Sequence, residues 1–272
     1  MRIAIFHRQL DPTASQQVAQ LTSLLQQRGA EIIDIDPATT PMPKPDFDAL
    51  LSVGGDGTLL SSVHLIGESG IPVIGVNYGH LGFLTTVGQE VAPEQLVDDI
   101  VSGNYSIEER TLLHIDSSIP SAAPCTALNE ISLRREYADL LRVNLYVDDE
   151  FVAAYEGDGV IVATPTGSTA YSLSCGGPIL TPNSGCFVIT PIGAHTFTLR
   201  PMIVPDSAVI RLEPHYERGT YTLGIDSSYQ SMRGGAVFTL NREKHTIRLA
   251  RMHSQSFFTA IHEKLAWGTE LR

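Results

Sequence analysis

The sequence predicts an N-terminal α/β domain with a Rossmann-like parallel sheet, followed by a mostly β domain with an antiparallel, sandwich-like arrangement of strands. Strand and helix signals alternate over about the first hundred residues, whereas strand signals follow one another with few helices from about residue 105. The length of 272 residues suits two domains, because single domains typically run about 100–200 residues.

The N-terminal part alternates short apolar runs with helical patterns. Apolar residues recur at helical spacing over residues 15–28, which predicts a helix that stops at Gly29, and a shorter helix is expected over residues 59–66. The prolines of residues 37–45 predict a loop. The apolar runs that predict strands are residues 3–6, 31–35, 49–53 and 71–76.

The rest of the chain has the period-two alternation of half-buried strands. Residues 143–147 and 246–251 alternate apolar and polar side chains, and prolines and glycines recur between such segments. Residues 257–267 return to a helical pattern. We therefore expect an α/β domain, a β domain and a C-terminal helix that packs back on the first domain, at residues 1–103, 104–256 and 257–272.

The composition favours a soluble, cytoplasmic protein that binds neither nucleic acid nor membranes. Its 18 basic and 30 acidic residues give a formal net charge of −12, which opposes binding to phosphate backbones and to anionic lipid. No signal peptide is visible, and no apolar run approaches the ~20 residues of a membrane helix. Sparse cysteines without a CxxC pair are typical of reduced thiols: Cys125, Cys175 and Cys186.

A glycine-rich loop, Gly54-Gly55-Asp56-Gly57-Thr58, follows the third predicted strand and precedes a helix. Glycines let a backbone approach a phosphate closely, and the free N–H groups of a helix N-terminus attract anions. Ligands of open α/β sheets bind beyond the carboxyl ends of the strands. The loop matches neither GxxxxGK[ST] nor GxGxxG, the two standard nucleotide fingerprints.

Asp56 is the informative residue of this loop. A carboxylate among phosphate-binding glycines repels a phosphate unless it holds a metal ion or handles a proton, and either role fits phosphoryl transfer. The hypothesis is that Asp56 orients a hydroxyl group and accepts its proton late in the reaction. Two alternatives stay open: Asp56 mainly positions a metal ion, or it is only the N-cap of the following helix.

Two further segments carry polar groups suited to a ligand. Residues 77–84 follow the fourth predicted strand and either line the same crevice or form a loop anchored by their apolar side chains. Asn129 and Glu130 interrupt an apolar run that predicts a strand, so they need partners if they are buried. Their amide and carboxylate suit the edge of a base and the hydroxyls of a ribose.

The longest motif runs from Gly157-Asp158-Gly159 through a strand at residues 160–163 to Gly177-Pro178. Hydroxyls and glycines without a lysine suit neutral polar contacts to a sugar or a nucleotide. A turn in which Ser168 caps a short helix would explain Ser168 and Gly167 but not the whole run. The hydroxyl groups lie within eleven residues, at Thr164, Thr166, Ser168, Thr169, Tyr171, Ser172 and Ser174.

With these motifs in this order, the chain resembles the NAD kinase family over roughly residues 1–270. That family shares a GGDGT loop, an NxGxLGFL segment, an NE pair and a GDG…TPTGSTAYxLSxGGP block, which occur here at residues 54–58, 77–84, 129–130 and 157–178. Diacylglycerol kinases, sphingosine kinases and phosphofructokinases carry loops similar to GGDGT, whereas the long block is specific. The resemblance implies phosphorylation of the adenosine-ribose 2′-hydroxyl of NAD to give NADP, with ATP, another nucleoside triphosphate or polyphosphate as donor and a divalent metal, Mg²⁺.

The resemblance also implies roles for individual residues. Asp56 becomes the proton acceptor, and Tyr171 offers a stacking surface. No protein ligand of the metal is implied. The residues implied in NAD binding are Gly55, Asp56, Gly57, Leu60, Phe83, Asn129, Glu130, Asp158, Thr166, Thr169, Ala170, Tyr171, Ser172, Leu173 and Ser174. Those implied in holding the phosphate donor are Gly54, Gly57, Thr58 and His64.

This chain departs from parts of the family at three places. Several members have arginine at the position of His64, and some have a basic residue at that of Glu156. Some carry Asp-Ser-Gln or Asp-His where this chain has Asp226, Ser227 and Ser228, so a ligand contact from these three residues is left open. Such contacts often come from a neighbouring subunit, and the resemblance therefore implies a homodimer or homotetramer with the ligand site near a subunit interface.

Two other functions are alternatives to the NAD kinase interpretation. A lipid kinase that shares only the GGDGT core would need a basic or apolar surface facing the membrane, which the net charge of −12 opposes. A dinucleotide sensor without activity would be favoured by loss of the acid, whereas Asp56 is present. The sequence does not fix the choice between ATP and polyphosphate, the preference between NAD and NADH, or feedback by NADP and NADPH.

Overall fold

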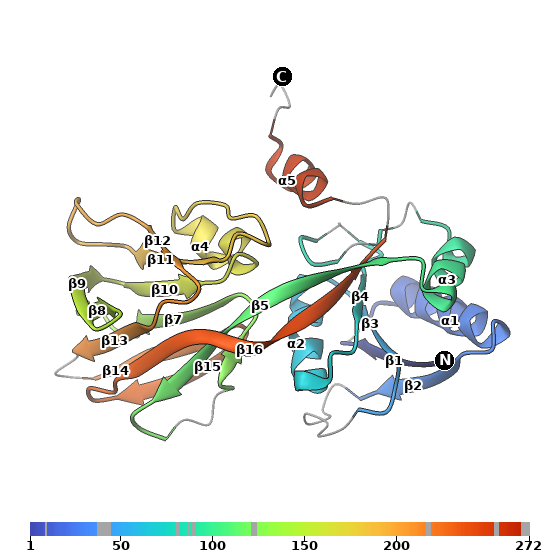
Figure 1. Cartoon of the computed structure of the whole chain (residues 1–272), viewed down its shortest axis with the longest axis horizontal. Coiled ribbons are helices and arrows are strands. Elements are labelled where there is room, and N and C mark those ends of the chain that lie inside the picture. Colours follow the sequence, from blue (N-terminus) through green and yellow to red (C-terminus); the bar gives the residue numbers. More distant parts are fainter. Residues whose placement is uncertain are drawn as a thin grey trace. The chain divides into compact units, whose positions relative to one another are not determined.

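The protein forms two compact units, one of residues 1–109 and 247–272 and one of residues 110–246, in the computed structural model shown in Figure 1. We call them the α/β unit and the β unit. Both boundaries fall inside long strands, β5 (Ser106–Ser117) and β16 (Phe238–Arg251), which therefore contribute residues to both units. The structure describes residues 1–8, 10–36, 45–79, 82–85, 87–88, 91–120, 124–215, 219–252 and 256–267, so nearly all of the predicted loop 37–45 lies outside the described residues.

The α/β unit is built on a parallel sheet with the strand order β2-β1-β3-β4, and the end of β16 pairs with β4. This order puts a topological switch point between β1 and β3, where sheets of this type bind their ligands. The elements are β1 (Arg2–His7), α1 (Pro12–Gln27), β2 (Glu31–Ile35), β3 (Ala49–Val53), α2 (Asp56–Ile66), a 3-10 turn (Gly67–Ser69), β4 (Val73–Val76), α3 (Pro93–Ser102) and α5 (Phe257–Leu265).

Helices cover both faces of this sheet, which explains why its strands are apolar throughout. Leu51 and Ile74 pack with α1 and α3 in one core cluster, and α1 and α3 lie against each other. Figure 1 shows α2 on the opposite face, where it contacts β3 and β4. Alternate residues of a strand point to opposite faces, so burial on both faces requires an unbroken apolar run such as Ala49–Val53.

Helix boundaries in this unit follow local chemistry. Asp11 caps α1 by accepting the N–H of Ala14 at 2.8 Å, and Pro12 occupies the first helical position. The sequence analysis did not predict α3, although Pro93 at its first turn and Gly103 after its end are typical helix signals. No helix in the described ranges is long and apolar enough to cross a membrane.

The β unit has two antiparallel sheets that share one apolar core. One sheet has the order β12-β11-β10-β7-β14-β15, and the other contains β9, β8, β13 and the first part of β16, with β5 and β6 beside them. The elements are β6 (Thr126–Ala127), β7 (Glu130–Arg135), β8 (Leu141–Val147), β9 (Glu150–Gly157), β10 (Gly159–Ala163), a 3-10 turn (Gly167–Thr169), α4 (Tyr171–Ser174), β11 (Cys186–Ile192), β12 (Met202–Pro205), β13 (Ile210–His215), β14 (Thr220–Ile225) and β15 (Ser228–Arg233).

Strand β10 is the centre of this unit because it is buried on both faces. Val160 and Val162 pack into the core between the sheets, whereas Ile161 and Ala163 pack under the segment that carries α4. In the register of β10 with β7, Ala163 lies opposite Glu130. The chain that leaves β10 therefore starts beside the Asn129-Glu130 pair.

The predicted fold class, an α/β domain followed by a mostly β antiparallel domain, is confirmed. The predicted strand 49–53 coincides with β3, while the helix predicted at 59–66 begins earlier, at Asp56. The helix predicted over 257–267 ends at Leu265, because Ala266 adopts a left-handed φ of 52°. The domain boundaries at residues 103 and 256 stay sequence predictions.

Candidate active site

The glycine loop lies at the carboxyl end of β3, where the chain turns into α2. Gly54 has a φ of 144°, a value that favours glycine, and a Cβ at this position would lie 2.5 Å from Oγ1 of Thr58. Gly55 is the N-cap of α2 and Asp56 is its first residue. The loop thus joins a flexible glycine backbone to a helix N-terminus, which together suit a phosphate group.

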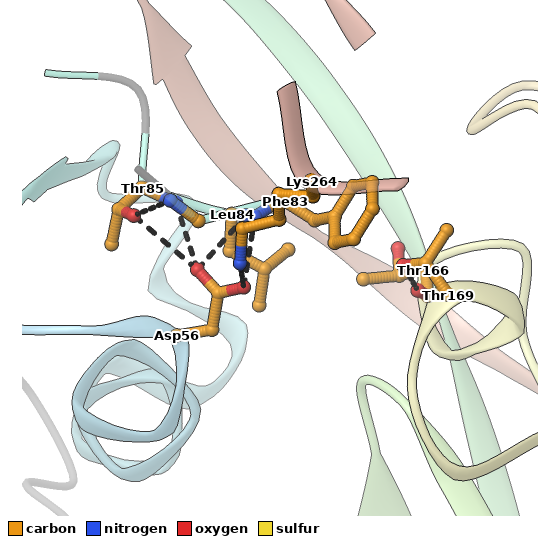
Figure 2. Close-up of polar contacts among 8 residues, drawn as sticks. Asp56, Phe83, Leu84, Thr85, Thr166, Thr169 and Lys264 are labelled. Atoms are coloured by element: carbon orange, nitrogen blue, oxygen red, sulfur yellow. Dashed lines mark hydrogen bonds and ion pairs between the residues drawn. The ribbon is translucent and has the colours of Figure 1, made fainter. Parts of the chain in front are cut away.

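The Asp56 carboxylate binds a second segment, Phe83–Thr85, as Figure 2 shows. Its Oδ2 accepts the backbone N–H of Phe83 at 2.8 Å. Its Oδ1 accepts the N–H groups of Leu84 and Thr85 at 3.1 and 3.2 Å, and the Thr85 hydroxyl at 3.3 Å. We call this arrangement the Asp56 clamp. The alternative of Asp56 as the cap of α2 is therefore wrong, since its partners come from the loop after β4.

The two oxygens of the clamp differ in what they can still accept. A carboxylate oxygen has about two acceptor sites, and the three donors on Oδ1 occupy it fully. Oδ2 takes one backbone N–H, so it keeps capacity for one further donor. A hydroxyl group of a bound ligand would therefore meet Asp56 at Oδ2.

Gly82 allows the loop to come this close to Asp56. A Cβ at residue 82 would overlap Oδ1 of Asp56 and Oγ1 of Thr85. The N–H of Gly82 also donates to Oγ1 of Thr85 at 2.8 Å, which orients that hydroxyl. The glycine of the predicted LGFL segment is thus required by close packing.

A cavity of about 350 Å³ borders the glycine loop on the side of α1. It brings Gly54 next to Asn77 and Tyr78 of the second predicted motif, at the carboxyl ends of β3 and β4. Burial raises the pKa of the Tyr78 hydroxyl, which keeps it neutral. The interpretation that both glycine runs line one crevice is consistent with this lining.

In the β unit, Asn129 and Glu130 do not lie in the middle of one strand, as the sequence suggested: Asn129 lies in a bend and Glu130 is the first residue of the strand that follows. Strand β6 ends at Ala127 and β7 starts at Glu130, so Asn129 belongs to the bend between them. The buried carboxylate of Asp226 accepts the N–H groups of Leu128 and Asn129 at 2.8 Å and that of Glu130 at 3.1 Å. Polar residues interrupt the apolar run here because the backbone turns around Asp226.

Glu130 has an unusual environment. Its Oε2 is buried and has no hydrogen-bond partner among the residues that the structure describes. Burial and the negative charge of Asp226 together raise the pKa of Glu130 to about 8, although the positive charge of Arg134 opposes them. A buried carboxyl oxygen without a partner is costly, and a hydroxyl or amide of a ligand would satisfy it.

The hydroxyl-rich run forms a 3-10 turn and the short helix α4. Ser168 does not cap a helix, because its Oγ donates to the carbonyl of Pro165 at 2.6 Å and accepts the N–H of Leu180 at 2.9 Å. Thr164 and Ser172 are likewise fully buried and bind Leu128 and Thr190. These three hydroxyls hold the motif together.

The remaining hydroxyls of the run differ in accessibility. Thr166 is buried and accepts from Arg110 at 3.1 Å, while Thr169 donates to the carbonyl of Thr166. Tyr171 is half-buried, and Ser174 is exposed. Burial raises the pKa of the Tyr171 hydroxyl, so it is a neutral donor.

The Asn129-Glu130 pair and the hydroxyl-rich run meet within the β unit. The N–H of Thr164 donates to the carbonyl of Asn129 at 2.9 Å, and a Cβ on Gly167 would overlap that same carbonyl. Beside them lies a cavity of about 420 Å³ whose lining includes Arg134, Asp158 and Tyr171. The guanidinium of Arg134 lies 5.8 Å from the Tyr171 ring, and Asp158 pairs with Arg135 at 2.7 Å.

The sequence-derived residues thus form one group in each unit. The glycine loop, Leu60 and the clamp residue Phe83 belong to the α/β unit, and His64 lies in the last turn of α2, at the far end of the helix from the loop. Ser227 is exposed and Ser228 half-buried, whereas Asp226 holds the turn. In the β unit lie Asn129, Glu130, Asp158, Thr166, Thr169, Ala170, Tyr171, Ser172, Leu173 and Ser174.

Sequence reasoning missed two residues that shape these groups. Thr85 completes the Asp56 clamp from a position 29 residues away, and no local pattern marks it. Asp226 was considered only as a ligand contact, although an aspartate at a positive φ of 48° after a strand is a turn signal. Across the described ranges, no group of three or more His, Cys, Asp or Glu side chains could hold a metal ion.

Comparison with known proteins follows the same division of the chain. The ATP-NAD kinase N-terminal domain matches residues 5–105, and the ATP-NAD kinase C-terminal domain matches residues 128–236. An NAD kinase from Porphyromonas gingivalis (strain W83) is 44% identical over 227 residues, which cover 83% of this chain and 78% of that protein. The chain belongs to the ATP-NAD kinase family. An NAD kinase from Christiangramia forsetii is 31% identical over 294 residues that span both proteins completely.

Solved structures agree with this membership. Yeast NADH kinase complexed with NADH superposes with a TM-score of 0.87 at 25% identity, covering 100% of this chain and 89% of that one. An NAD kinase from Archaeoglobus fulgidus in complex with ATP gives a TM-score of 0.80 at 26% identity, covering 98% and 99%. The chain is therefore an enzyme of the NAD kinase family, which phosphorylates NAD with ATP, and not a lipid kinase or a sensor.

Proposed function

We propose that this member of the NAD kinase family transfers the terminal phosphoryl group of ATP to the 2′-hydroxyl of the adenosine ribose of NAD, giving NADP. The observation that supports this reaction best is the Asp56 clamp, which holds a carboxylate at the N-terminus of α2 with one acceptor site left on Oδ2. Another nucleoside triphosphate or polyphosphate is the alternative donor.

In this mechanism Asp56 is the general base. The 2′-hydroxyl donates its hydrogen bond to Oδ2, the ribose oxygen bonds to the terminal phosphorus, and the bond from that phosphorus to the leaving nucleoside diphosphate breaks. The proton passes to Asp56 late, because phosphoryl transfer has a loose transition state that needs little nucleophile activation. The N–H groups at the start of α2, together with Gly54, Gly57 and Thr58, bind the donor phosphates.

A divalent cation, Mg²⁺, fits this site only with help from the donor. Asp56 is the one carboxylate of the glycine loop, and Mg²⁺ commonly takes one or two carboxylates together with substrate phosphates. Because the remaining acceptor site of Asp56 receives the ribose hydroxyl in this mechanism, the ion would be held mainly by the donor phosphates, and it would neutralise charge on the transferred group.

The NAD contacts are assigned to the two groups of residues described above. Gly55, Gly57, Leu60 and Phe83 bind the adenosine end, and Glu130 accepts a ribose hydroxyl at its unpartnered Oε2. We further assign the remaining NAD contacts to Asn129, Asp158, Thr166, Thr169, Ala170, Tyr171, Leu173 and Ser174, and a donor-phosphate contact to His64. Ser172, which is buried and bonded to Thr190, supports these contacts from inside the motif. Residues 1–103 carry the glycine loop, 104–256 the nucleotide contacts, and 257–272 a helix that packs on the first domain.

The setting of the enzyme is also part of the proposal. We assign it to the cytoplasm, and we propose a homodimer or homotetramer with the ligand site near a subunit interface. Light scattering coupled to size exclusion measures the oligomer directly, and a monomer at working concentrations contradicts this assignment.

Incubation with NAD, ATP and Mg²⁺ tests the reaction, with the product measured by an NADP-specific dehydrogenase. An NAD analogue with 2′-deoxyadenosine should bind without being phosphorylated, which fixes the position of transfer. Absence of NADP with wild-type protein contradicts the proposed reaction.

Asp56→Asn tests the general base, with Asp98→Asn as the control. Loss of a general base typically lowers kcat by about 10²–10⁴-fold. Because the asparagine also weakens the clamp, the Kd of NAD is measured separately, and a proton-acceptor role predicts that kcat falls far more than affinity. Asp98 is a partly exposed residue of α3 that pairs with Arg28, so its change should leave turnover unaffected. Near wild-type turnover of Asp56→Asn rules out the base.

A further inference from the structure

Helix α5 docks on the Asp56 clamp through two of its side chains. Nζ of Lys264 lies 3.9 Å from Oδ2 of Asp56 and 5.1 Å from the centre of the Phe83 ring. The ring of Phe257, at the start of the same helix, lies 6.4 Å from that of Phe83. Figure 2 shows Lys264 beside Phe83 at the edge of the clamp. All these residues belong to the α/β unit.

Lys264 places a positive charge close to the Asp56 carboxylate. The chain has three lysines, at residues 44, 244 and 264. Among the described residues, Lys264 is the one basic side chain within ion-pair distance of the Asp56 carboxylate. Its side chain is 33% exposed and that of Asp56 is 28% exposed, so solvent screens the pair only in part.

The distance of 3.9 Å matters for what Lys264 can do. Hydrogen bonds from nitrogen to oxygen span about 2.7–3.2 Å, so the ammonium attracts Oδ2 without occupying its remaining acceptor site. The backbone N–H of Phe83 and the ammonium of Lys264 then attract the same oxygen, Oδ2 of Asp56. Phe83 connects the two groups, because it supplies the N–H and its ring lies next to the ammonium. Oδ2 is held in place and still open to a hydroxyl.

We propose that Lys264 is a positioning residue for phosphoryl transfer, which holds Oδ2 of Asp56 in the orientation that accepts the ribose hydroxyl. Helix α5, the last helix among the described residues, in this way contributes a side chain to the active site. The inference rests on the proposed role of Asp56 as general base. Lys264 acts through Asp56 and Phe83 and does not need to touch the substrate.

Lys264→Met tests this role because methionine keeps most of the length of the unbranched side chain and removes its charge. We expect kcat to fall about tenfold while KM for NAD stays within about twofold, since misplacing a catalytic group by about 1 Å can cost up to about 10²-fold. Lys264→Arg should recover most of the lost kcat, because the guanidinium keeps the charge and the contact with the ring of Phe83. Lys244→Met is the matched control, since Lys244 is an exposed lysine on β16.

The docking of α5 can be followed without activity. Trp267 is the single tryptophan of the chain, and its carbonyl lies 2.9 Å from Nδ1 of His262 on α5. Its fluorescence should therefore report on this helix. Lys264→Met should keep the wild-type emission spectrum, whereas Phe257→Ala, which removes the ring packed against Phe83, should shift it.

The outcomes separate this inference from the proposed function. A kcat of Lys264→Met within twofold of wild type, or above it, overturns the positioning role when Asp56→Asn has lost turnover. A fall in kcat that comes with an equally large rise in KM and a shifted Trp267 spectrum also overturns it. The lysine would then serve only to hold helix α5 in place. Wild-type turnover of Asp56→Asn overturns the general base and this inference with it.

Discussion

Asp226, in the turn between β14 and β15, accepts the backbone N–H of Glu130 at 3.1 Å, so that one carboxylate fixes the start of the strand that carries another. The amides of Leu128 and Asn129 bind the same carboxylate. The burial of Glu130 and, second to it, the anchored negative charge of Asp226 both oppose ionisation of Glu130 and raise its pKa. This relationship makes Glu130 the group of the candidate site whose protonation responds to pH.

The stability of the protein should depend on Glu130 between about pH 4.5 and pH 8. The pKa of this carboxyl is raised from 4.5 to about 8 on folding, so the folded state holds its proton more tightly than the unfolded state does. The stabilisation is complete below pH 4.5 and is lost as the pH rises towards 8. Glu130→Gln has no such proton, and its stability relative to wild type should increase across this range.

Chemical denaturation of both proteins at several pH values measures this difference. Glu150→Gln, an exposed change on β9, controls for the loss of one carboxyl group. Stability curves of wild type and Glu130→Gln that run parallel from pH 5 to pH 8 would show that Glu130 is ionised in the folded protein.

Asp226→Ala should damage the candidate NAD site from a distance. The change leaves three backbone N–H groups without their acceptor, and each buried donor without a partner costs about 1–3 kcal/mol. Alanine also tolerates the φ of 48° at this position less well than aspartate or asparagine does. We expect lower stability and a raised KM for NAD, and Asp226→Asn should be milder in both.

Asp148→Ala is the matched control for this prediction. Asp148 also has a positive φ, of 50°, and its carboxylate accepts the N–H of Val209 at 2.9 Å, in the turn between β8 and β9. Its loss should lower stability without changing KM. Equal effects of the two alanine variants on KM would mean that Asp226 does not shape the site.

The sequence predicted what local patterns encode. Strand β3 was located to the residue because burial on both faces requires the unbroken apolar run Ala49–Val53, and the loop after it is marked by its glycines. The pairing of Asp56 with Phe83–Thr85 could not be predicted in the same way. It depends on β3 and β4 lying next to each other, so that loops 27–29 residues apart meet.

The candidate site in the β unit shows the same limit. The residue types of the hydroxyl-rich run indicated polar contacts, but three of these hydroxyls, Thr164, Ser168 and Ser172, are buried in internal hydrogen bonds. Composition cannot distinguish a hydroxyl that faces a ligand from one that fixes a turn, because both need the same chemical group. Lys264 was missed for a related reason, since one lysine on an amphipathic helix has no local signal.

Gly167→Ala should disrupt the contact between the Asn129-Glu130 pair and the hydroxyl-rich run of the β unit. A Cβ at residue 167 would overlap the backbone carbonyl of Asn129, which cannot move without breaking its bond to the N–H of Thr164. We expect a raised KM for NAD together with lower thermal stability. Gly235→Ala is the control, because its Cβ would meet only the carbonyl of Pro214, at 3.8 Å, and its φ is not positive. An unchanged KM in Gly167→Ala would show that the two motifs do not form one NAD site.

Gly82→Ala should inactivate the enzyme through the Asp56 clamp. The added Cβ would overlap Oδ1 of Asp56, and the backbone on which it stands is tied to Thr85, so the carboxylate has to turn away. Rotation of the carboxylate moves Oδ2 as well, and a displacement of about 1 Å at a catalytic group costs up to about 10²-fold in rate. We therefore expect a large fall in kcat, measured in the NADP-forming assay, with NAD still bound.

The same Gly235→Ala variant controls for the addition of a methyl group to a glycine. A Gly82→Ala enzyme with wild-type kcat would mean that the position of the Asp56 carboxylate does not limit the reaction, which would contradict its role as the base.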